Sequence, residues 1–168
     1  MTQKRAAIGL MNPKSPTNVG SVLRAAGCMN AQQIFYSGER YDRAKAFYTD
    51  TQNSNKAVTL THVDELFSHA PKGAKIVGVE LVEGAQSLIE FQHPDNAYYI
   101  FGPEDGSLTQ KQVNQCHAVV YIPTKGCLNL AATVNVVLYD RLSKSADIVS
   151  GDELIRKSRD TNNTAQVK

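Results

Sequence analysis

The sequence predicts an α/β protein with a mostly parallel sheet and helices on both of its faces. Short apolar runs of strand length alternate along the chain with segments whose apolar residues recur at helical spacing. The runs KIVGVEL at 75–81 and AYYIF at 97–101 have the composition of buried strands. Strands and helices that alternate in this way build parallel sheets with two covered faces.

The first residues are predicted to form a strand, a helix and a second strand. Residues 6–11 are apolar, and the two prolines that follow them prevent either type of element from continuing. Thr17 or Asn18 can then cap a helix that ends near residues 27–30. Residues 33–36 form the short second strand.

A long polar segment follows at residues 37–56. Loops of this length are uncommon unless they have a function. Aromatic residues and arginines are interleaved in it, and they are Arg40, Tyr41, Arg43, Phe47 and Tyr48. Such a mixture suits stacking on unpaired bases beside phosphates, and packing of the aromatic rings beneath the loop explains it equally well.

Strands and helices continue to alternate as far as residue 118. A strand is predicted at 57–60, and Thr61 with Asp64 resembles a capping box that opens a helix through Leu66 and Phe67. The elements after it are a strand at 75–81, a helical turn at 87–91, a strand at 97–101 and a helix at about 108–115.

The last apolar block, residues 119–142, organises the rest of the chain. It opens as a strand at 119–122, breaks at Pro123, and continues after a tight loop as a helix that starts near Leu128 and Asn129. Apolar residues cover two sides of this helix, so we expect it to be buried in a larger core or against a partner subunit. The loop before the helix follows the carboxyl end of a strand, where open α/β sheets place their ligands.

The chain length predicts one domain, which we place at residues 1–145. The sequence turns polar after Ser145. Residues 146–168 are therefore predicted to be a polar C-terminal extension, partly disordered, with one short helix at about 152–157.

Composition is that of an ordinary globular protein, with 42% hydrophobic and 20% charged residues. The chain opens without a signal pattern, and no apolar run approaches the roughly 18 residues of a membrane span. We therefore expect a cytoplasmic protein that does not contact membranes. The cysteines, Cys28, Cys116 and Cys127, and the four histidines lack metal-ligand spacing, so we expect reduced thiols and no metal site.

The positive charge lies mainly in the first third of the chain. The formal net charge is only +2, but residues 1–56 carry eight Lys and Arg against three Asp and Glu. The remainder carries ten against thirteen. A basic N-terminal third suits a polyanionic partner, because contacts with phosphates release counterions, and a solvated surface is the alternative.

Three loops at the carboxyl ends of predicted strands carry the residues with the most chemistry. They span residues 12–24, 102–106 and 123–129. Taken singly, the first could be only a capped helix, and the second only a tight turn with proline at its second position. The functional interpretation rests on the occurrence of all three together, in this order.

The ordered set of loops resembles the SpoU/TrmH branch of the SPOUT superfamily of RNA methyltransferases. The family motif N-x-G-S-x-x-R-x-A is matched by Asn18, Gly20, Ser21, Arg24 and Ala26. A strand followed by G-x-E-x-x-G is matched more loosely, with Gly106 one residue early, by Phe101, Gly102, Pro103 and Glu104. The third motif, I-P and then S-L-N before an apolar helix, is matched by Ile122, Pro123, Leu128 and Asn129, and Cys127 stands where the family usually has serine. The resemblance covers about residues 5–144.

The resemblance implies a fold, a cofactor and an oligomeric state. The family threads its C-terminal segment through a deep trefoil knot and works as a homodimer, which would place the two-sided apolar helix in the dimer interface. S-adenosylmethionine would lie bent in the knot. The residues expected to bind it are Val79, Glu80, Leu81, Gly102, Ile122, Cys127 and Leu128. A residue without Cβ at Gly102 would let the backbone approach the ligand closely.

The reaction that the resemblance implies is methyl transfer to a ribose 2′-hydroxyl of RNA. Its expected catalytic residues are Arg24, Asn18, Glu104 and Asn129. A guanidinium with a pKa above about 12 is a poor base, so Arg24 is better interpreted as a cation that holds a phosphate and stabilises the developing alkoxide. The alternative, in which an RNA phosphate removes a proton from Arg24 so that it can act as a base, stays open. The resemblance also leaves open which protomer of the dimer supplies Arg24.

RNA is the expected partner, and it would bind over the basic N-terminal third. The predicted contacts are Lys14, Arg40, Arg43 and Lys45. Small single-domain members of this branch mostly act on tRNA, so the resemblance favours tRNA over rRNA. The cysteine at 127 and the shortened second motif suit an alternative, a SPOUT-like RNA-binding or cofactor-sensing protein that has lost transfer. A flavodoxin-like nucleotide-binding domain would need a glycine-rich fingerprint, which is absent from the sequence.

Overall fold

The computed structural model describes residues 4–46 and 57–168. In this part of the chain seven strands form one sheet with the order β3-β2-β1-β6-β4-β7-β5, and all the pairings are parallel. The strands are β1 (Arg5–Leu10), β2 (Ala31–Tyr36), β3 (Thr59–His62), β4 (Lys75–Val79), β5 (Gln86–Ser87), β6 (Asn96–Phe101) and β7 (Ala118–Tyr121). The predicted α/β class is confirmed. Because the strands are parallel, the loops that follow them meet at one edge of the sheet.

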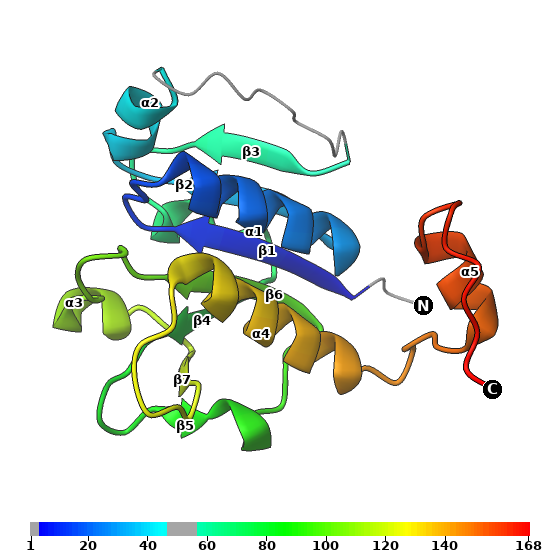
Figure 1. Ribbon diagram of the computed structural model, residues 1–168. Coiled ribbons are helices and arrows are strands. Elements are labelled where there is room, and N and C mark those ends of the chain that lie inside the picture. The colour runs from blue at the N-terminus through cyan, green and yellow to red at the C-terminus, as the bar shows by residue number, and fades with distance from the viewer. Residues whose placement is uncertain (1–3, 47–56) are drawn as a thin grey trace.

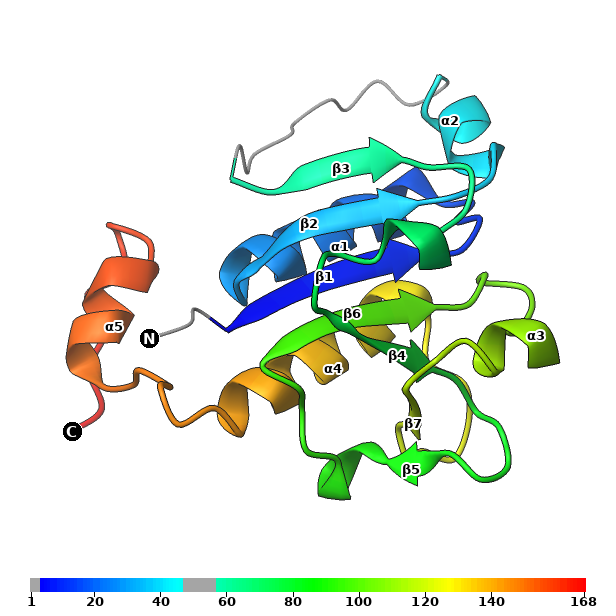
Figure 2. The ribbon, with the colours of Figure 1, turned by 180° about the vertical axis from the view of Figure 1, so that it is seen from behind.

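Helices cover both faces of the sheet. The helical elements are α1 (Pro16–Cys28), α2 (Arg40–Lys45), η1 (Phe67–His69), η2 (Leu88–Glu90), α3 (Gln110–Val113), α4 (Leu130–Ser143) and α5 (Asp152–Ser158). Helices α1 and α4 lie side by side on one face and enclose the larger apolar core (Figure 1). The segment around η1, together with Leu108 before α3 and Val113 at its end, packs a smaller core against the other face (Figure 2). No helix of the described residues is long and apolar enough to cross a membrane.

Helix α1 begins earlier than the sequence predicts. The hydroxyl of Ser15 accepts a hydrogen bond from the Asn18 backbone N–H at 3.2 Å, and Pro16 occupies the first turn, where its missing N–H is not needed. The predicted cap at Thr17 or Asn18 is therefore wrong. Because Ser15 caps the helix, the Asn18 side chain can reach another loop.

The segment around β3 also differs from the prediction. β3 begins and ends two residues later than expected, so Thr61 pairs with β2 and cannot open a helix. Glu65 instead accepts hydrogen bonds from two backbone N–H groups, at 3.0 and 2.7 Å, and only the 3₁₀ turn η1 follows. The predicted capping box and its helix are wrong, because strand pairing takes the threonine into the sheet.

The described part of the polar segment after β2 contains a helix. Residues 40–45 form α2, although a loop was predicted there. The Tyr41 ring packs edge-on against Tyr36, with the ring centroids 5.0 Å apart. The interpretation of the aromatic residues as packing is thus confirmed for Tyr41, while Phe47 and Tyr48 lie outside the described residues.

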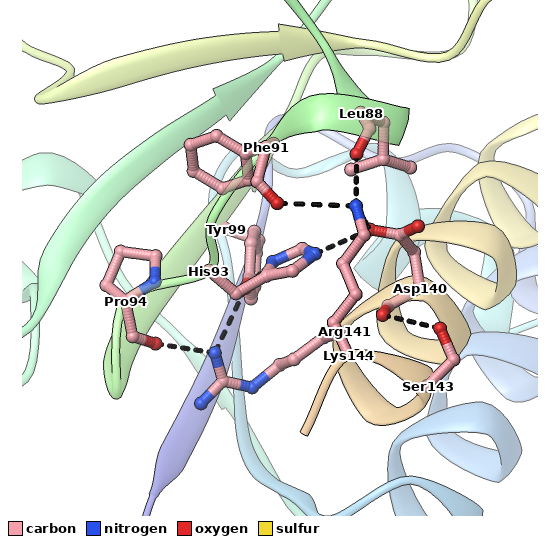
Figure 3. Close-up of polar contacts among 9 residues, drawn as sticks. All are labelled: Leu88, Phe91, His93, Pro94, Tyr99, Asp140, Arg141, Ser143 and Lys144. Atoms are coloured by element: carbon pink, nitrogen blue, oxygen red, sulfur yellow. Dashed lines mark hydrogen bonds and ion pairs between the residues drawn. The ribbon is translucent and has the colours of Figure 1, made fainter. Parts of the chain in front are cut away.

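A partly buried polar cluster fixes the last turn of α4 to the segment before β6 (Figure 3). His93 Nε2 lies 2.7 Å from Asp140 Oδ2, and Nδ1 lies 2.6 Å from the Tyr99 hydroxyl. That hydroxyl accepts a hydrogen bond from Arg141 at 3.2 Å. One arrangement satisfies every group: a neutral ring donates from Nε2 to Asp140 and accepts from Tyr99 at Nδ1. Burial lowers the pKa of His93, although the Asp140 carboxylate acts to raise it, which agrees with a neutral ring.

We expect acidification to destabilise the fold through His93. The pKa of His93 is lower in the folded chain than the value of about 6.5 for a free ring, so the unfolded state binds a proton first as the pH falls. The free energy of unfolding should then decrease from about pH 7 downwards, through the folded pKa. Thermal unfolding of the native chain and His93→Gln between pH 7.5 and 5.5 tests this. A loss of Tm that is equally steep in both proteins would contradict it.

Candidate active site

A cavity of about 380 Å³ opens at the carboxyl edge of the sheet. The segment after β4, the β6–α3 loop, the β7–α4 loop and the first turn of α1 surround it. Every residue predicted to bind the cofactor lines this cavity: Val79, Glu80, Leu81, Gly102, Ile122, Cys127 and Leu128. Three of the predicted catalytic residues line it as well, and they are Asn18, Glu104 and Asn129. The fold therefore brings the three predicted loops together.

Glu104 joins the β6–α3 loop to the start of α1. Its Oε1 accepts a hydrogen bond from the side-chain amide of Asn18 at 2.8 Å, and its Oε2 accepts one from the Lys14 backbone N–H at 2.9 Å. A carboxylate is suited to two donors at once, because each oxygen can accept independently. The first and second predicted motifs are thus in direct contact through one side chain.

Glu80 ties the segment after β4 to the far end of the β6–α3 loop. One carboxylate oxygen accepts from the Leu81 N–H at 3.0 Å and the other from the Leu108 N–H at 2.9 Å. A Cβ at Gly102 would lie only 2.9 Å from Glu80 Oε2 and 3.4 Å from the Leu108 nitrogen. A side chain at this position would therefore have to displace the Glu80 carboxylate.

Asn129 orders the wall formed by the β7–α4 loop. Its side-chain oxygen accepts a hydrogen bond from the Ala132 N–H at 2.7 Å and caps α4. The Thr133 hydroxyl donates to the Asn129 carbonyl at 2.8 Å and also lines the cavity. Thr133 was missed by the sequence analysis, although its spacing of four residues from Asn129 places both on one face of a helix.

Arg24 does not line the cavity of its own chain. It lies on α1 six residues after Asn18, which corresponds to about 9 Å along the helix axis and roughly 120° around it. The side chain is exposed, and within the described part of the chain it has no ion-pair or hydrogen-bond partner. A second macromolecule could therefore reach this guanidinium.

The four cations predicted to contact RNA all lie in ion pairs with neighbouring carboxylates. Lys14 and Arg40 contact Asp105 at 3.7 and 2.8 Å. On α2, Lys45 pairs with Asp42 at 2.9 Å, and Arg43 pairs with Glu39. Their role in RNA binding stays a prediction. No cluster of three or more potential metal ligands occurs among the residues that the structure describes.

Comparison with known proteins identifies the family. Residues 5–139 match the model of the SpoU rRNA Methylase family. The chain belongs to the SpoU rRNA methylase family. A curated relative, the 23S rRNA (guanosine-2'-O-)-methyltransferase RlmB of Acinetobacter baylyi, is 27% identical over 143 residues. The match covers 74% of this chain and 54% of the relative, so the chain spans about half the relative's length.

Solved structures share the SpoU fold with this chain. One, which gives insights into the 2-OH methylation of C/U34 on tRNA, is 23% identical with a TM-score of 0.68 and covers 86% of this chain and 92% of its own. The AdoMet-bound rRNA methyltransferase of Sinorhizobium meliloti is 18% identical with a TM-score of 0.67. The match covers 84% of this chain and 57% of that methyltransferase chain. The A. aeolicus TrmH/SpoU tRNA modifying enzyme is 21% identical with a TM-score of 0.68. The match covers 83% of this chain and 74% of that enzyme chain.

Cys127 is the position at which this SpoU chain departs from the third motif. Its side chain is exposed and lines the cavity, next to the cap residue Asn129. A thiol is a weaker hydrogen-bond donor and acceptor than the serine hydroxyl. The cavity keeps a small side chain here but loses hydrogen-bonding strength toward a bound molecule.

We expect Asn129→Ala to lower the free energy of unfolding of this SpoU domain by about 1 kcal/mol, because the capping oxygen of α4 is lost. Asn129→Asp retains that oxygen and should stay close to the native value. Urea unfolding at pH 7.5 measures both. If the alanine variant were as stable as the native chain, the cap would have no part in fixing the loop.

Proposed function

We propose that this chain is an S-adenosylmethionine-dependent RNA methyltransferase that methylates a ribose 2′-hydroxyl. The observation that carries the proposal is the single cavity into which the three motif loops converge, with Asn18, Gly102 and Leu128 on its wall. The family match supports RNA methylation. The RlmB relative is named as a guanosine-2'-O-methyltransferase, which supports the 2′-oxygen as acceptor, and the AdoMet-bound neighbour supports the cofactor.

The residues of the cavity fit an adenosyl cofactor. A volume of about 380 Å³ lies within the range of roughly 300–1,000 Å³ that small-molecule sites occupy. Leu81 and Leu128 are 52% and 40% exposed, so their large apolar side chains could pack against the adenine ring of the cofactor. Backbone groups around Val79–Leu81, Gly102 and Ile122 would hold the adenosine. When bound, the sulfonium supplies an electrophilic methyl group.

The protein's own groups have positioning and electrostatic tasks in this reaction. Glu104 and Asn18 keep the wall of the cavity next to the start of α1. Arg24 contributes a permanent positive charge that would hold an RNA phosphate and stabilise the oxygen that loses its proton.

A homodimer accounts for the position of Arg24 and for the exposed side of α4. Val134, Val137 and Leu138 of this helix are buried against the sheet and α1, whereas Val136 and Tyr139 are 38% and 63% exposed. Pairing two copies across α1 and α4 would cover these side chains and bring Arg24 toward the cavity of the other protomer. The trefoil knot of the family belongs to the same proposal, in one domain at residues 1–145 with an extension at 146–168.

The RNA is proposed to be tRNA first and rRNA second, in the cytoplasm. The tRNA-related structure matches this chain over most of both lengths, which supports tRNA. The RlmB relative acts on 23S rRNA but is about twice as long as the match, which weakens that comparison. Substrate class is therefore decided by experiment.

Labelled S-adenosylmethionine incubated with unmodified tRNA and, separately, with unmodified rRNA tests the proposal. We expect label in tRNA from the native chain. Label in rRNA alone would move the assignment to the second substrate. Cofactor binding by calorimetry without transfer to either RNA would favour a cofactor-sensing protein, and neither binding nor transfer would reject the proposal.

A further inference from the structure

Arg40, the first residue of α2, links two loops at the carboxyl edge without lining the cavity. Its Nη1 donates to both carboxylate oxygens of Asp105, at 2.9 and 2.8 Å. Its Nε and Nη2 donate to the carbonyl of Asn12, at 3.1 and 2.5 Å. One guanidinium at the start of α2 therefore holds the β6–α3 loop and the β1–α1 loop together.

The backbone that Arg40 contacts has an uncommon conformation. Asn12 has φ of 43°, in the left-handed region that few residues other than glycine adopt. Gly38, just before α2, has φ of 76°, and a Cβ there would lie 2.2 Å from the Asn12 side-chain oxygen. The β2–α2 turn and the β1–α1 loop are thus fitted closely to each other, and Arg40 is placed by that fit.

The loop held by Arg40 is a wall of the cavity. Gly102, Pro103, Glu104 and Gly106 of the β6–α3 loop line it, and Asp105 stands between the last two. Glu80 holds the far end of the loop through the Leu108 N–H. Asp105 and Glu104 hold its middle, toward Arg40 and Asn18 respectively. Loss of Arg40 would remove the hydrogen bonds of Asp105 and leave the middle of the loop held mainly through Glu104.

We propose that Arg40 is a positioning residue of the cavity, which through Asp105 and Asn12 keeps the β6–α3 loop in the shape that binds the methyl donor. This inference rests on the proposed function, since it needs S-adenosylmethionine in the cavity. It differs from the prediction that Arg40 contacts RNA, because both donor edges of the guanidinium are already engaged within the chain.

Geometry makes arginine necessary for this role. The Arg40 side chain is 31% exposed and that of Asp105 is 50% exposed, and a simple ion pair at such a site contributes little. The guanidinium, however, donates to a carboxylate and to a backbone carbonyl with a rigid fork of N–H groups. A lysine ammonium is a single point of charge and cannot span both acceptors in the same way.

The test compares cofactor affinity with RNA affinity in the full chain. S-adenosylmethionine is titrated by calorimetry into the native protein, Arg40→Ala, Arg40→Lys and Asp105→Asn, and unmodified tRNA binding and Tm are measured in parallel. Lys157→Ala is the control, since it removes an exposed ion pair with Glu153 on α5. We expect both Arg40 variants to raise the cofactor Kd about tenfold, or ~1.4 kcal/mol. Asp105→Asn should have a smaller effect, and the control should stay within about twofold.

The outcomes separate the possible roles of Arg40. An unchanged cofactor Kd in the Arg40 variants, with or without a lower Tm, overturns the proposal and marks a merely structural contact. Weaker RNA binding in Arg40→Ala that Arg40→Lys restores, with the cofactor Kd unchanged, also overturns it and assigns a phosphate contact. If Arg40→Ala does not fold, Arg40→Lys and Asp105→Asn decide the question. A native chain that binds no S-adenosylmethionine rejects the proposed function itself, and this role with it.

Discussion

Arg24→Ala is expected to reduce methyl transfer to RNA by about 10²–10³-fold while the affinity for S-adenosylmethionine stays within about twofold. The guanidinium is exposed on α1, lies outside the cavity and makes no ion pair within the described part of the chain, so its removal leaves the fold and the cofactor site intact. It would remove the charge that holds the RNA phosphate and stabilises the developing alkoxide. Single-turnover transfer and calorimetry measure the two effects separately.

Arg24→Lys distinguishes the two chemical roles that the sequence leaves open for Arg24. In one it is a cation that stabilises the developing alkoxide, and in the other it is a base whose own proton is removed by an RNA phosphate. A lysine keeps the positive charge but lacks the planar fork, so an electrostatic role predicts partial activity, between the native and alanine values. Ser21→Ala, on the exposed side of the same helix, is a control for stability. Equal transfer by the native chain and Arg24→Ala would remove Arg24 from the mechanism.

Gly102→Ala is expected to weaken cofactor binding by at least tenfold. The new methyl group would lie 2.9 Å from Glu80 Oε2, so the carboxylate would have to move and loosen its hydrogen bond to the Leu108 N–H. That movement would displace the segment after β4 and the β6–α3 loop, both of which line the cavity. A tenfold rise in Kd requires a loss of about 1.4 kcal/mol of binding free energy, which the displaced wall of the cavity would account for.

Gly20→Ala is a matched control for this variant. It is the glycine of the first motif, and no atom lies within 4 Å of a Cβ built there. Because glycine is a poor helix former, alanine at this exposed position of α1 should raise stability slightly and leave the cofactor Kd unchanged. A cofactor Kd for Gly102→Ala as low as that of Gly20→Ala would show that the contact with Glu80 does not shape the site.

The convergence of the three loops could be predicted because their positions follow from a local pattern. Each loop comes after an apolar strand, and parallel strands place such loops at one edge. Helix α4 was predicted nearly to the residue, since its apolar spacing and the cap at Asn129 are local signals. The start of α1 was predicted less well, because Ser15 competes with Thr17 and Asn18 as the cap.

Features that depend on distant pairing could not be predicted in this way. Register with β2 moves Thr61 into β3 and so removes a helix that local spacing favoured. Lys14 and Arg40 look like free cations in the sequence, but Asp105, which lies 65 residues beyond Arg40, forms an ion pair with each of them. A count of charges along the chain gives their number and not their partners. The separation of Arg24 from the cavity of its own chain likewise depends on the fold, so the sequence could not predict it.

Mass spectrometry of the methylated nucleoside tests the central claim most directly. Unmodified tRNA and rRNA are incubated with the native chain and S-adenosylmethionine and digested to nucleosides, and the position of the new methyl group is read from the fragments. We predict a methyl group on the ribose 2′-oxygen, formed about 10²–10³-fold more slowly when Arg24→Ala replaces the native chain. A methyl group on a base, or none on either RNA while the chain still binds the cofactor, would contradict ribose 2′-oxygen transfer from this cavity.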